Sequence, residues 1–189
     1  MDAMPETAWE ESNTTWRGFP WRSGEKTEIE RWTHGQTGYP LIDAGMRELQ
    51  ATGFMHNRVR MACADFFSRH MMIDWRVGEE IFRGLLLCGD RAQNVGNWQW
   101  VAGCGLNARA YFRVSNPLTL SKTADPEAIY IKRWVPELRD VSNEDIFALS
   151  SITQSADYPA PMLDFKQTRA RYIETAKAHL AKNKSGPEA

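Results

Sequence analysis

The sequence predicts an all-α protein, and three observations carry that prediction. Apolar residues recur at helical spacing along most of the chain, good N-capping residues precede these stretches, and no stretch alternates apolar and polar residues as a half-buried strand does. The 189 residues, 42% of them hydrophobic, are enough for one domain with a real core. The chain shows neither an internal repeat nor a low-complexity linker.

Capped apolar stretches predict four helices in the first part of the chain. Pro40 suits the first turn of one helix, and Gly53 ends it. Asp74 and Asp90 are good N-caps for two others. The expected ranges are 40–53, 55–72, 74–88 and 90–101. Residues 1–38 are polar and weakly periodic, so we expect mostly loop there.

The rest of the chain continues the helical pattern. We interpret residues 115–117, Ser-Asn-Pro, as a turn. Asp125 followed by Pro126 predicts the start of a helix that runs to about Val135. Asp164 is a good N-cap for a final amphipathic helix. The remaining expectations are a short helix over 144–150, an extended stretch over 158–161, the final helix over 164–182 and a disordered tail over 183–189.

The composition excludes two classes of protein. No apolar run approaches the roughly 20 residues of a membrane span, and the acidic residues 1–6 lack the apolar centre of a signal peptide. Cys63, Cys88 and Cys104 form no CxxC pair and no metal-ligand spacing, which is typical of free thiols in a reducing compartment. We therefore expect a cytoplasmic protein that binds neither a metal nor a membrane.

The charge is uneven along the chain. The formal net charge is −1, so the total does not indicate a nucleic-acid-binding protein. Residues 54–123, however, hold nine basic and five acidic side chains, and such a locally basic stretch can meet phosphates. A solvated helical surface explains the same charges, and on charge alone that interpretation is preferred.

One helix face in the stretch 53–61 carries side chains suited to a nucleobase. Asn57 and Met61 lie on that face, together with Ala64 and Ser68. The Asn57 amide can pair with a base edge, and Met61 adds a soft apolar contact beside it. The alternative is an ordinary amphipathic helix with a capping asparagine.

Trp98 and Trp100 lie two residues apart in the sequence Asn-Trp-Gln-Trp. On a helix such residues point to nearly opposite sides, so the two indoles serve different neighbours. Two ordinary core tryptophans explain the spacing equally well.

Three stretches, residues 37–47, 53–61 and 89–100, closely resemble the photolyase/cryptochrome family in their order and spacing. Residues 113–117 and 133–138 resemble it too. The resemblance covers about 19–141, whereas 142–189 match only loosely. It implies that residues 1–189 are the C-terminal part of a FAD-binding helical domain, without the antenna domain.

The resemblance implies a FAD site formed by Arg60, Cys88, Asp90, Asn94 and Trp98. Asn94 matches the position beside flavin N5, where an amide can donate or accept. An asparagine there resembles photolyases, and many cryptochromes carry another side chain. The family usually has an aspartate at Cys88 that pairs with the arginine matching Arg60. A neutral thiol cannot form that pair, so we expect weakened flavin affinity.

The resemblance also implies a lesion site for DNA that contains pyrimidine dimers. Asn57, Arg58, Met61 and Trp100 match its residues: Arg58 meets a phosphate and Trp100 stacks on the flipped base. Asn57-Arg58 with Met61 resembles enzymes for cyclobutane dimers. Enzymes for (6-4) photoproducts typically carry histidine on this helix, a pattern that His56 alone does not reproduce.

Three tryptophans match the electron relay that the family uses to reduce its flavin. Trp98 matches the proximal position and Trp75 the middle one. Trp21 is our choice for the distal position, and Trp16 is the alternative.

The function that the resemblance implies is light-driven repair of cyclobutane pyrimidine dimers by a deoxyribodipyrimidine photo-lyase with reduced, anionic FAD. No N-terminal antenna domain and no flavin-diphosphate loop precede residue 19. We therefore expect a fragment that is inactive alone, or one partner of a split protein whose other half supplies the rest. A cryptochrome-type blue-light photoreceptor and an inert truncated remnant are the alternatives.

Overall fold

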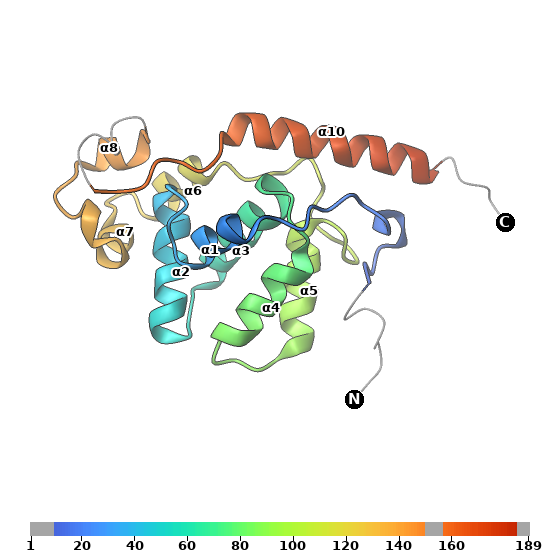
Figure 1. Ribbon diagram of the computed structural model, residues 1–189, viewed down its shortest axis with the longest axis horizontal. Helices are drawn as coiled ribbons and strands as arrows, with labels where there is room; N and C mark the ends of the chain where they lie inside the picture. The colour runs from blue at the N-terminus through green and yellow to red at the C-terminus, as the bar shows by residue number, and fades with distance from the viewer. Residues whose placement is uncertain (1–9, 150–156, 185–189) are drawn as a thin grey trace.

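The computed structural model describes residues 10–149 and 157–184, and within them it confirms the all-α class (Figure 1). An isolated bridge between Arg22 and Ile73 is the extended pairing found in this part of the chain. The α-helices are α1 (Lys26–Thr33), α2 (Pro40–Thr52), α3 (Asn57–Asp65), α4 (Trp75–Leu85), α5 (Arg91–Ala102), α6 (Pro117–Ala124), α7 (Ile129–Trp134), α8 (Asn143–Phe147) and α10 (Phe165–Lys184). Two 3-10 turns, Thr14–Trp16 and Pro136–Leu138, and a π-helical turn, Phe66–His70, complete the elements.

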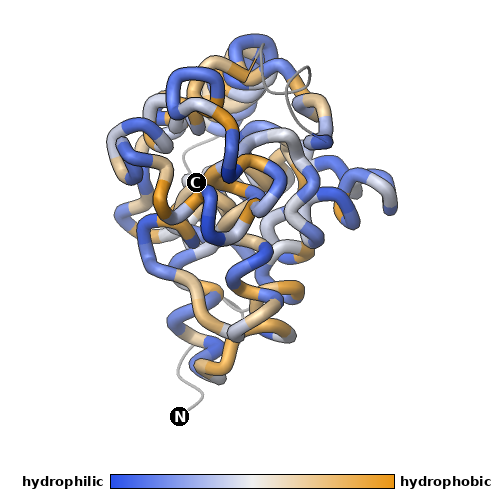
Figure 2. Tube along the Cα trace, turned by 90° about the vertical axis from the view of Figure 1, so that its left-hand side faces the viewer, coloured by the Kyte–Doolittle hydropathy of each residue, from blue (hydrophilic) through white to orange (hydrophobic). Residues whose placement is uncertain are grey.

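Two buried clusters organise the helices. The larger one lies among α2, α3, α4 and α5, and α10 covers it along one side (Figure 1). The smaller one gathers α7, the turn after it and α8 beside α2. The tube in Figure 2 changes repeatedly between hydrophobic and hydrophilic colours along the chain, as expected for helices with one apolar and one polar face. No helix in the described ranges is long and apolar enough to span a bilayer.

The predicted bounds of α2 and the predicted starts of α4 and α5 are confirmed, whereas α4 ends at Leu85, before the expected end near Cys88. Pro40 begins α2, and Gly53 ends it in the left-handed conformation at φ 66°. The Asp74 carboxylate accepts a hydrogen bond from the Arg76 N–H, and Asp90 accepts one from the Gln93 N–H. The two caps fix the residues at which α4 and α5 begin.

Two helices were missing from the prediction. α1 lies inside the range expected to be mostly loop, because Ile29 and Trp32 are the only apolar residues in its sequence and only Trp32 is buried. Its start is marked by the Glu28 carboxylate, which accepts from the Glu25 N–H at 2.9 Å. α6 begins where we expected a turn: Asn116 accepts from the N–H groups of the next turn, and Pro117 occupies the first helical position.

The predicted start near Asp125 was wrong for α7. Ala128 adopts a left-handed conformation at φ 52°, and the helix begins only at Ile129. Asp125 still acts as a cap, because its Oδ2 accepts from the Ile131 N–H at 2.9 Å. The cap therefore reaches over a turn before the helix.

The remaining predicted helices are present with changed bounds. The range 55–72 is α3 followed by the π-helical turn, and His56, instead of Asn57, is the N-cap. The short helix expected over 144–150 is α8. Asp164 caps α10, which includes residues 183 and 184 of the expected disordered tail. Residues 185–189, and the end of the range 144–150, lie outside the described residues.

The first sequence motif holds the two clusters together. Asp43 is fully buried and accepts hydrogen bonds from the Thr37 N–H and hydroxyl, the Gly38 N–H and the Tyr158 hydroxyl. Burial raises the pKa of Asp43, and these four donors oppose that rise. The motif 37–47 is therefore a structural junction.

Candidate functional site

A cavity of about 490 Å³ opens between the start of α3, the end of α4 and the first turns of α5. This is within the usual size range of small-molecule sites. Among its lining residues are seven that the sequence predicted for the flavin or the lesion: Asn57, Arg60, Met61, Cys88, Asp90, Asn94 and Trp98. Residues from two separate stretches of the chain, 54–64 and 82–101, thus meet at one site.

The Asn94 side chain has a fixed orientation. Its Nδ2 donates to the Glu79 carbonyl oxygen at 3.1 Å and to the Glu79 Oε1 at 3.0 Å. Because both partners are acceptors, the amide nitrogen must face Glu79 and the amide oxygen must face away. No residue of the described ranges donates to that oxygen in the structure. Asn94 therefore offers the cavity a positioned hydrogen-bond acceptor.

Arg60 and Cys88 both line the cavity, and their side chains are in contact. The Arg60 Nη1 lies 3.6 Å from the Cys88 Sγ, and its Nε donates to the Met55 carbonyl oxygen at 2.7 Å. The guanidinium also lies 6.0 Å from the centre of the Phe54 ring. Within the described residues no carboxylate is in ion-pair contact with Arg60, and the Cys88 thiol is in hydrogen-bond contact with its guanidinium.

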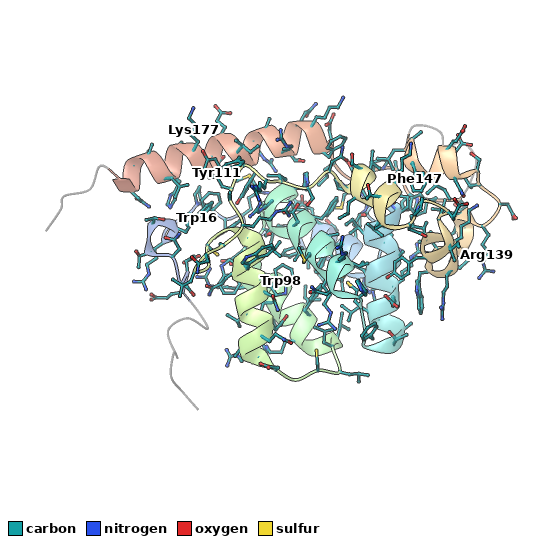
Figure 3. All side chains as sticks on the ribbon, turned by 180° about the vertical axis from the view of Figure 1, so that it is seen from behind. Trp16, Trp98, Tyr111, Arg139, Phe147 and Lys177 are labelled. Atoms are coloured by element: carbon teal, nitrogen blue, oxygen red, sulfur yellow. The ribbon has the colours of Figure 1, made fainter. Side chains whose placement is uncertain are left out.

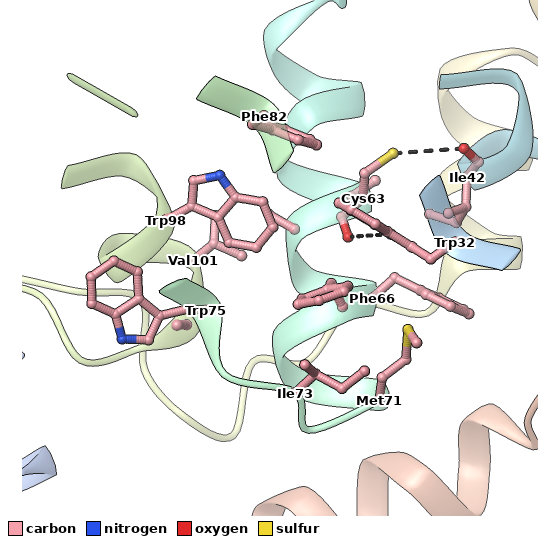
Figure 4. Close-up of a cluster of buried hydrophobic side chains, with 14 of the residues drawn as sticks. Trp32, Ile42, Cys63, Phe66, Met71, Ile73, Trp75, Phe82, Trp98 and Val101 are labelled. Atoms are coloured by element: carbon pink, nitrogen blue, oxygen red, sulfur yellow. Dashed lines mark hydrogen bonds between the residues drawn. The ribbon is translucent and has the colours of Figure 1, made fainter. Parts of the chain in front are cut away.

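Trp98 forms a rigid apolar wall. It is only 2% exposed, and its ring meets those of Trp32, Phe67 and Phe82 edge to face at 5.0–6.3 Å (Figure 4). On the other side the ring lies directly against Gly78 of α4, where a Cβ would overlap it. The indole is therefore confined on all these sides.

The predicted relay residues come from three segments that pack together. Trp75 is fully buried one turn before Gly78, the residue against which the Trp98 ring lies, and both indoles are drawn in Figure 4. The Arg22–Ile73 bridge holds the residue after Trp21 beside the segment that leads into Trp75. The buried indole nitrogens of these three tryptophans have no hydrogen-bond partner in the described structure.

Trp21 and Trp16 differ in their surroundings. Trp21 is partly exposed and packs on Phe19 at 4.4 Å. Trp16 is 3% exposed and lies near His179 of α10, with 6.3 Å between the ring centres; it and Trp98 are labelled in Figure 3. A distal relay residue must reach solvent, so this arrangement favours Trp21.

Trp100 and Arg58 do not line the cavity. Trp100 is half-buried on the other side of α5, in agreement with the spacing argument, and Arg58 is exposed. The structure thus separates these two lesion candidates from Asn57 and Met61.

Sequence reasoning missed several residues of the site, one that orients Asn94 and two that line the cavity. Glu79, which orients Asn94, is 5% exposed, yet its spacing to Arg83 is that of an ordinary surface ion pair on a helix. Phe82 and Gln93 also line the cavity without any local signal. Their roles depend on how α4 packs against α5, which no local pattern encodes.

The fold and the cavity define a helical domain built around a cofactor-sized pocket. The family described as the FAD binding domain of DNA photolyase matches residues 1–178, and the chain belongs to this family. Within the described residues no group of three or more His, Cys, Asp and Glu side chains could hold a metal ion.

Named relatives and solved structures agree with the family. The deoxyribodipyrimidine photo-lyase of Agrobacterium fabrum is 40% identical over 180 residues, 90% of this chain and 37% of that protein. The Escherichia coli enzyme of the same name is 42% identical over 168 residues, 87% of this chain and 35% of that protein. The chain thus spans about a third of the length of these relatives.

Two solved structures share the fold. The class III photolyase from Agrobacterium tumefaciens superposes with a TM-score of 0.86 at 40% identity, over 95% of this chain and 39% of that one. The Synechocystis cryptochrome superposes with a TM-score of 0.81 at 35% identity, over 89% and 37%. Both branches of the family therefore share this helical arrangement.

Proposed function

We propose that this chain is the C-terminal part of the FAD-binding domain of a photolyase that repairs cyclobutane pyrimidine dimers in DNA by light-driven electron transfer. The observation that carries the proposal is the cavity in which Glu79 orients Asn94 next to the confined indole of Trp98. Family membership supports it, as do relatives named deoxyribodipyrimidine photo-lyase.

The cavity fits a flavin ring, which is flat, apolar on its faces and polar along one edge. Trp98 and Phe82 supply an apolar wall, Asn94 supplies an acceptor for a ring N–H, and Arg60 supplies a positive charge. A bound, reduced and anionic FAD supplies the electron that splits the dimer. The residues of this chain hold donor and lesion in position and keep water from one side of the ring.

Asn57, Arg58, Met61 and Trp100 are the proposed contacts to DNA. Asn57 and Met61 lie at the cavity mouth, where a base flipped out of the duplex can approach the flavin. The exposed Arg58 would bind a phosphate, and the half-buried Trp100 would stack on a base.

Trp98, Trp75 and Trp21 are the proposed relay. Their indoles are rigidly packed, they lead from the cavity to a partly exposed residue, and Gly78 keeps the first two close together. The relay re-reduces the flavin and takes no part in dimer splitting.

Cys88 distinguishes this chain from the family pattern. A thiol 3.6 Å from Arg60 leaves the guanidinium without a carboxylate at a part-exposed site. Asn57, Cys88 and Asp90 are exposed around the cavity, so the described residues cover the flavin on one side. We therefore propose that this chain alone holds FAD weakly and that the other part of the protein completes the site. A cytoplasmic location and the lack of an antenna chromophore site in this chain remain predictions.

A photoreceptor of the cryptochrome type is the second candidate, favoured by the likeness to the Synechocystis structure. The asparagine at position 94 favours repair. The test is a complete photolyase in which residues 1–189 replace the matching segment. Light-dependent loss of dimers from an oligonucleotide supports repair. Flavin binding and photoreduction without dimer loss would favour the photoreceptor, and a folded protein without flavin would favour an inert remnant.

A further inference from the structure

A buried carboxylate lies beside the proposed relay, at a residue that no motif singles out. Glu11 is 5% exposed, and its Oε1 lies 3.1 Å from the Arg76 Nη1. The same guanidinium lies over the face of the Trp75 ring, 4.7 Å from its centre, and 3.1 Å from the Asp74 Oδ1. Trp75 thus has one cation directly on its ring, and two carboxylates pair with that cation.

Gln99 fixes the position of Glu11. The Gln99 Nε2 donates to the Glu10 carbonyl oxygen at 2.9 Å, and its Oε1 accepts from the Ser12 N–H at 3.0 Å and the Ser12 hydroxyl at 2.5 Å. Gln99 is 1% exposed and follows Trp98 directly in the chain. One buried amide therefore holds the residues on both sides of Glu11 and connects them to the helix that carries the proximal tryptophan.

The charges have opposite effects on the oxidation of Trp75. A guanidinium on the ring face disfavours the loss of an electron, because the product is a second positive charge at short range. Glu11 and Asp74 each carry a negative charge that offsets the guanidinium. Burial alone raises the pKa of Glu11, but the hydrogen bond from Arg76 and its charge outweigh burial, so the pKa is lowered and the side chain is ionised at neutral pH.

We propose that Glu11 is a positioning residue of the electron relay: its carboxylate, held in place by Gln99, neutralises Arg76 and keeps Trp75 oxidisable. This inference rests on the proposed function. In the step concerned, one electron passes from Trp75 to the oxidised Trp98, which returns Trp98 to neutral and leaves the positive charge on Trp75. An electron from Trp21 then restores Trp75.

The first test uses the complete photolyase that carries this chain and measures Trp oxidation by transient absorption after a flash. Glu11→Gln should slow the oxidation of Trp75 by about tenfold, the effect of about 1.4 kcal/mol on a barrier. Glu11→Asp should recover part of the rate. Glu10→Gln is the matched control, because Glu10 pairs with Arg17 on the exposed surface, and it should leave the rate unchanged.

The sign of a second substitution separates electrostatics from simple packing. Arg76→Gln removes the cation from the ring, so it should raise the rate alone and restore it in the Glu11→Gln background. Losses in both single variants would show that the cluster only maintains the fold and would overturn the proposal. So would an unchanged rate in Glu11→Gln.

A further readout does not depend on flavin. In the chain itself, the ¹H–¹⁵N resonance of the Trp75 indole, assigned with Trp75→Phe, should shift in Glu11→Gln and stay in place in Glu10→Gln. An unshifted resonance overturns the placement of Glu11. If Glu11→Gln has no effect while Trp98→Phe still abolishes photoreduction, the relay stands and only the role of Glu11 is lost. A flavin-bound parent without photoreduction overturns both.

Discussion

Gly78→Ala tests the contact that confines Trp98. A Cβ at position 78 would overlap three atoms of the Trp98 ring, two of them at 2.6 and 2.9 Å. Trp32, Phe67 and Phe82 pack edge to face against the same ring and limit its movement. Overpacking of this kind costs about 1–3 kcal/mol. Alanine regains about 1 kcal/mol of helix propensity, so we expect a net loss of about 0–2 kcal/mol in the free energy of unfolding.

Two glycines in the same helical pair provide the controls. A Cβ added to Gly84 in α4 or to Gly96 in α5 would meet no atom within 4 Å, so alanine there should stabilise the chain by about 0.5–1 kcal/mol. The assay is urea unfolding of the chain at constant pH, with fluorescence and circular dichroism as probes. If Gly78→Ala stabilises the chain as much as the two controls do, Trp98 does not lie against α4, and the proposed geometry of the relay is wrong.

Three further predictions address the site and the fold. In the complete photolyase, Trp98→Phe should slow photoreduction of oxidised flavin, while repair that starts from chemically reduced flavin should continue; equal photoreduction rates would return Trp98 to a packing role. Arg58→Ala should weaken binding of damaged and intact DNA alike and reduce the salt slope by about one, whereas Trp100→Ala should cost about 1–3 kcal/mol for damaged DNA only, in binding assays at two salt concentrations. Burial lowers the pKa of His70, so the unfolded chain binds a proton that the folded chain does not, and stability should fall as the pH drops below about 6.5. His70→Gln should flatten this pH dependence in unfolding curves from pH 8 to pH 5. An unchanged pH dependence would contradict the lowered pKa of His70.

Local signals in the sequence explain which parts of the fold were predictable. Pro40, Gly53 and Asp90 act within one turn of the chain, so the bounds of α2 and the start of α5 follow from them. The start of α7 does not, because Asp125 caps across a turn that depends on the left-handed Ala128. A short helix such as α1, with Ile29 and Trp32 as its only apolar residues, leaves too little of a pattern to detect.

The same distinction between local and non-local signals applies to the residues of the site. Asn94, Arg60 and Cys88 lie within or next to stretches that resemble a known family, and the structure places all three at one cavity. Glu79 and Glu11 were not predicted. Each acts on a residue that another segment of the chain brings to it, and their burial becomes visible only when the segments pack.

Dimer repair by the complete photolyase that carries this chain tests the proposed function most directly. Oligonucleotides with a single cyclobutane dimer are incubated with the protein and reduced flavin, in blue light and in the dark, and intact thymines are counted by chromatography. We expect repair in the light and none in the dark. Asn94→Leu, a variant that cannot orient the flavin edge, should show a clear loss of repair. A protein that binds flavin and damaged DNA yet leaves the dimer intact under light would contradict the proposed repair function.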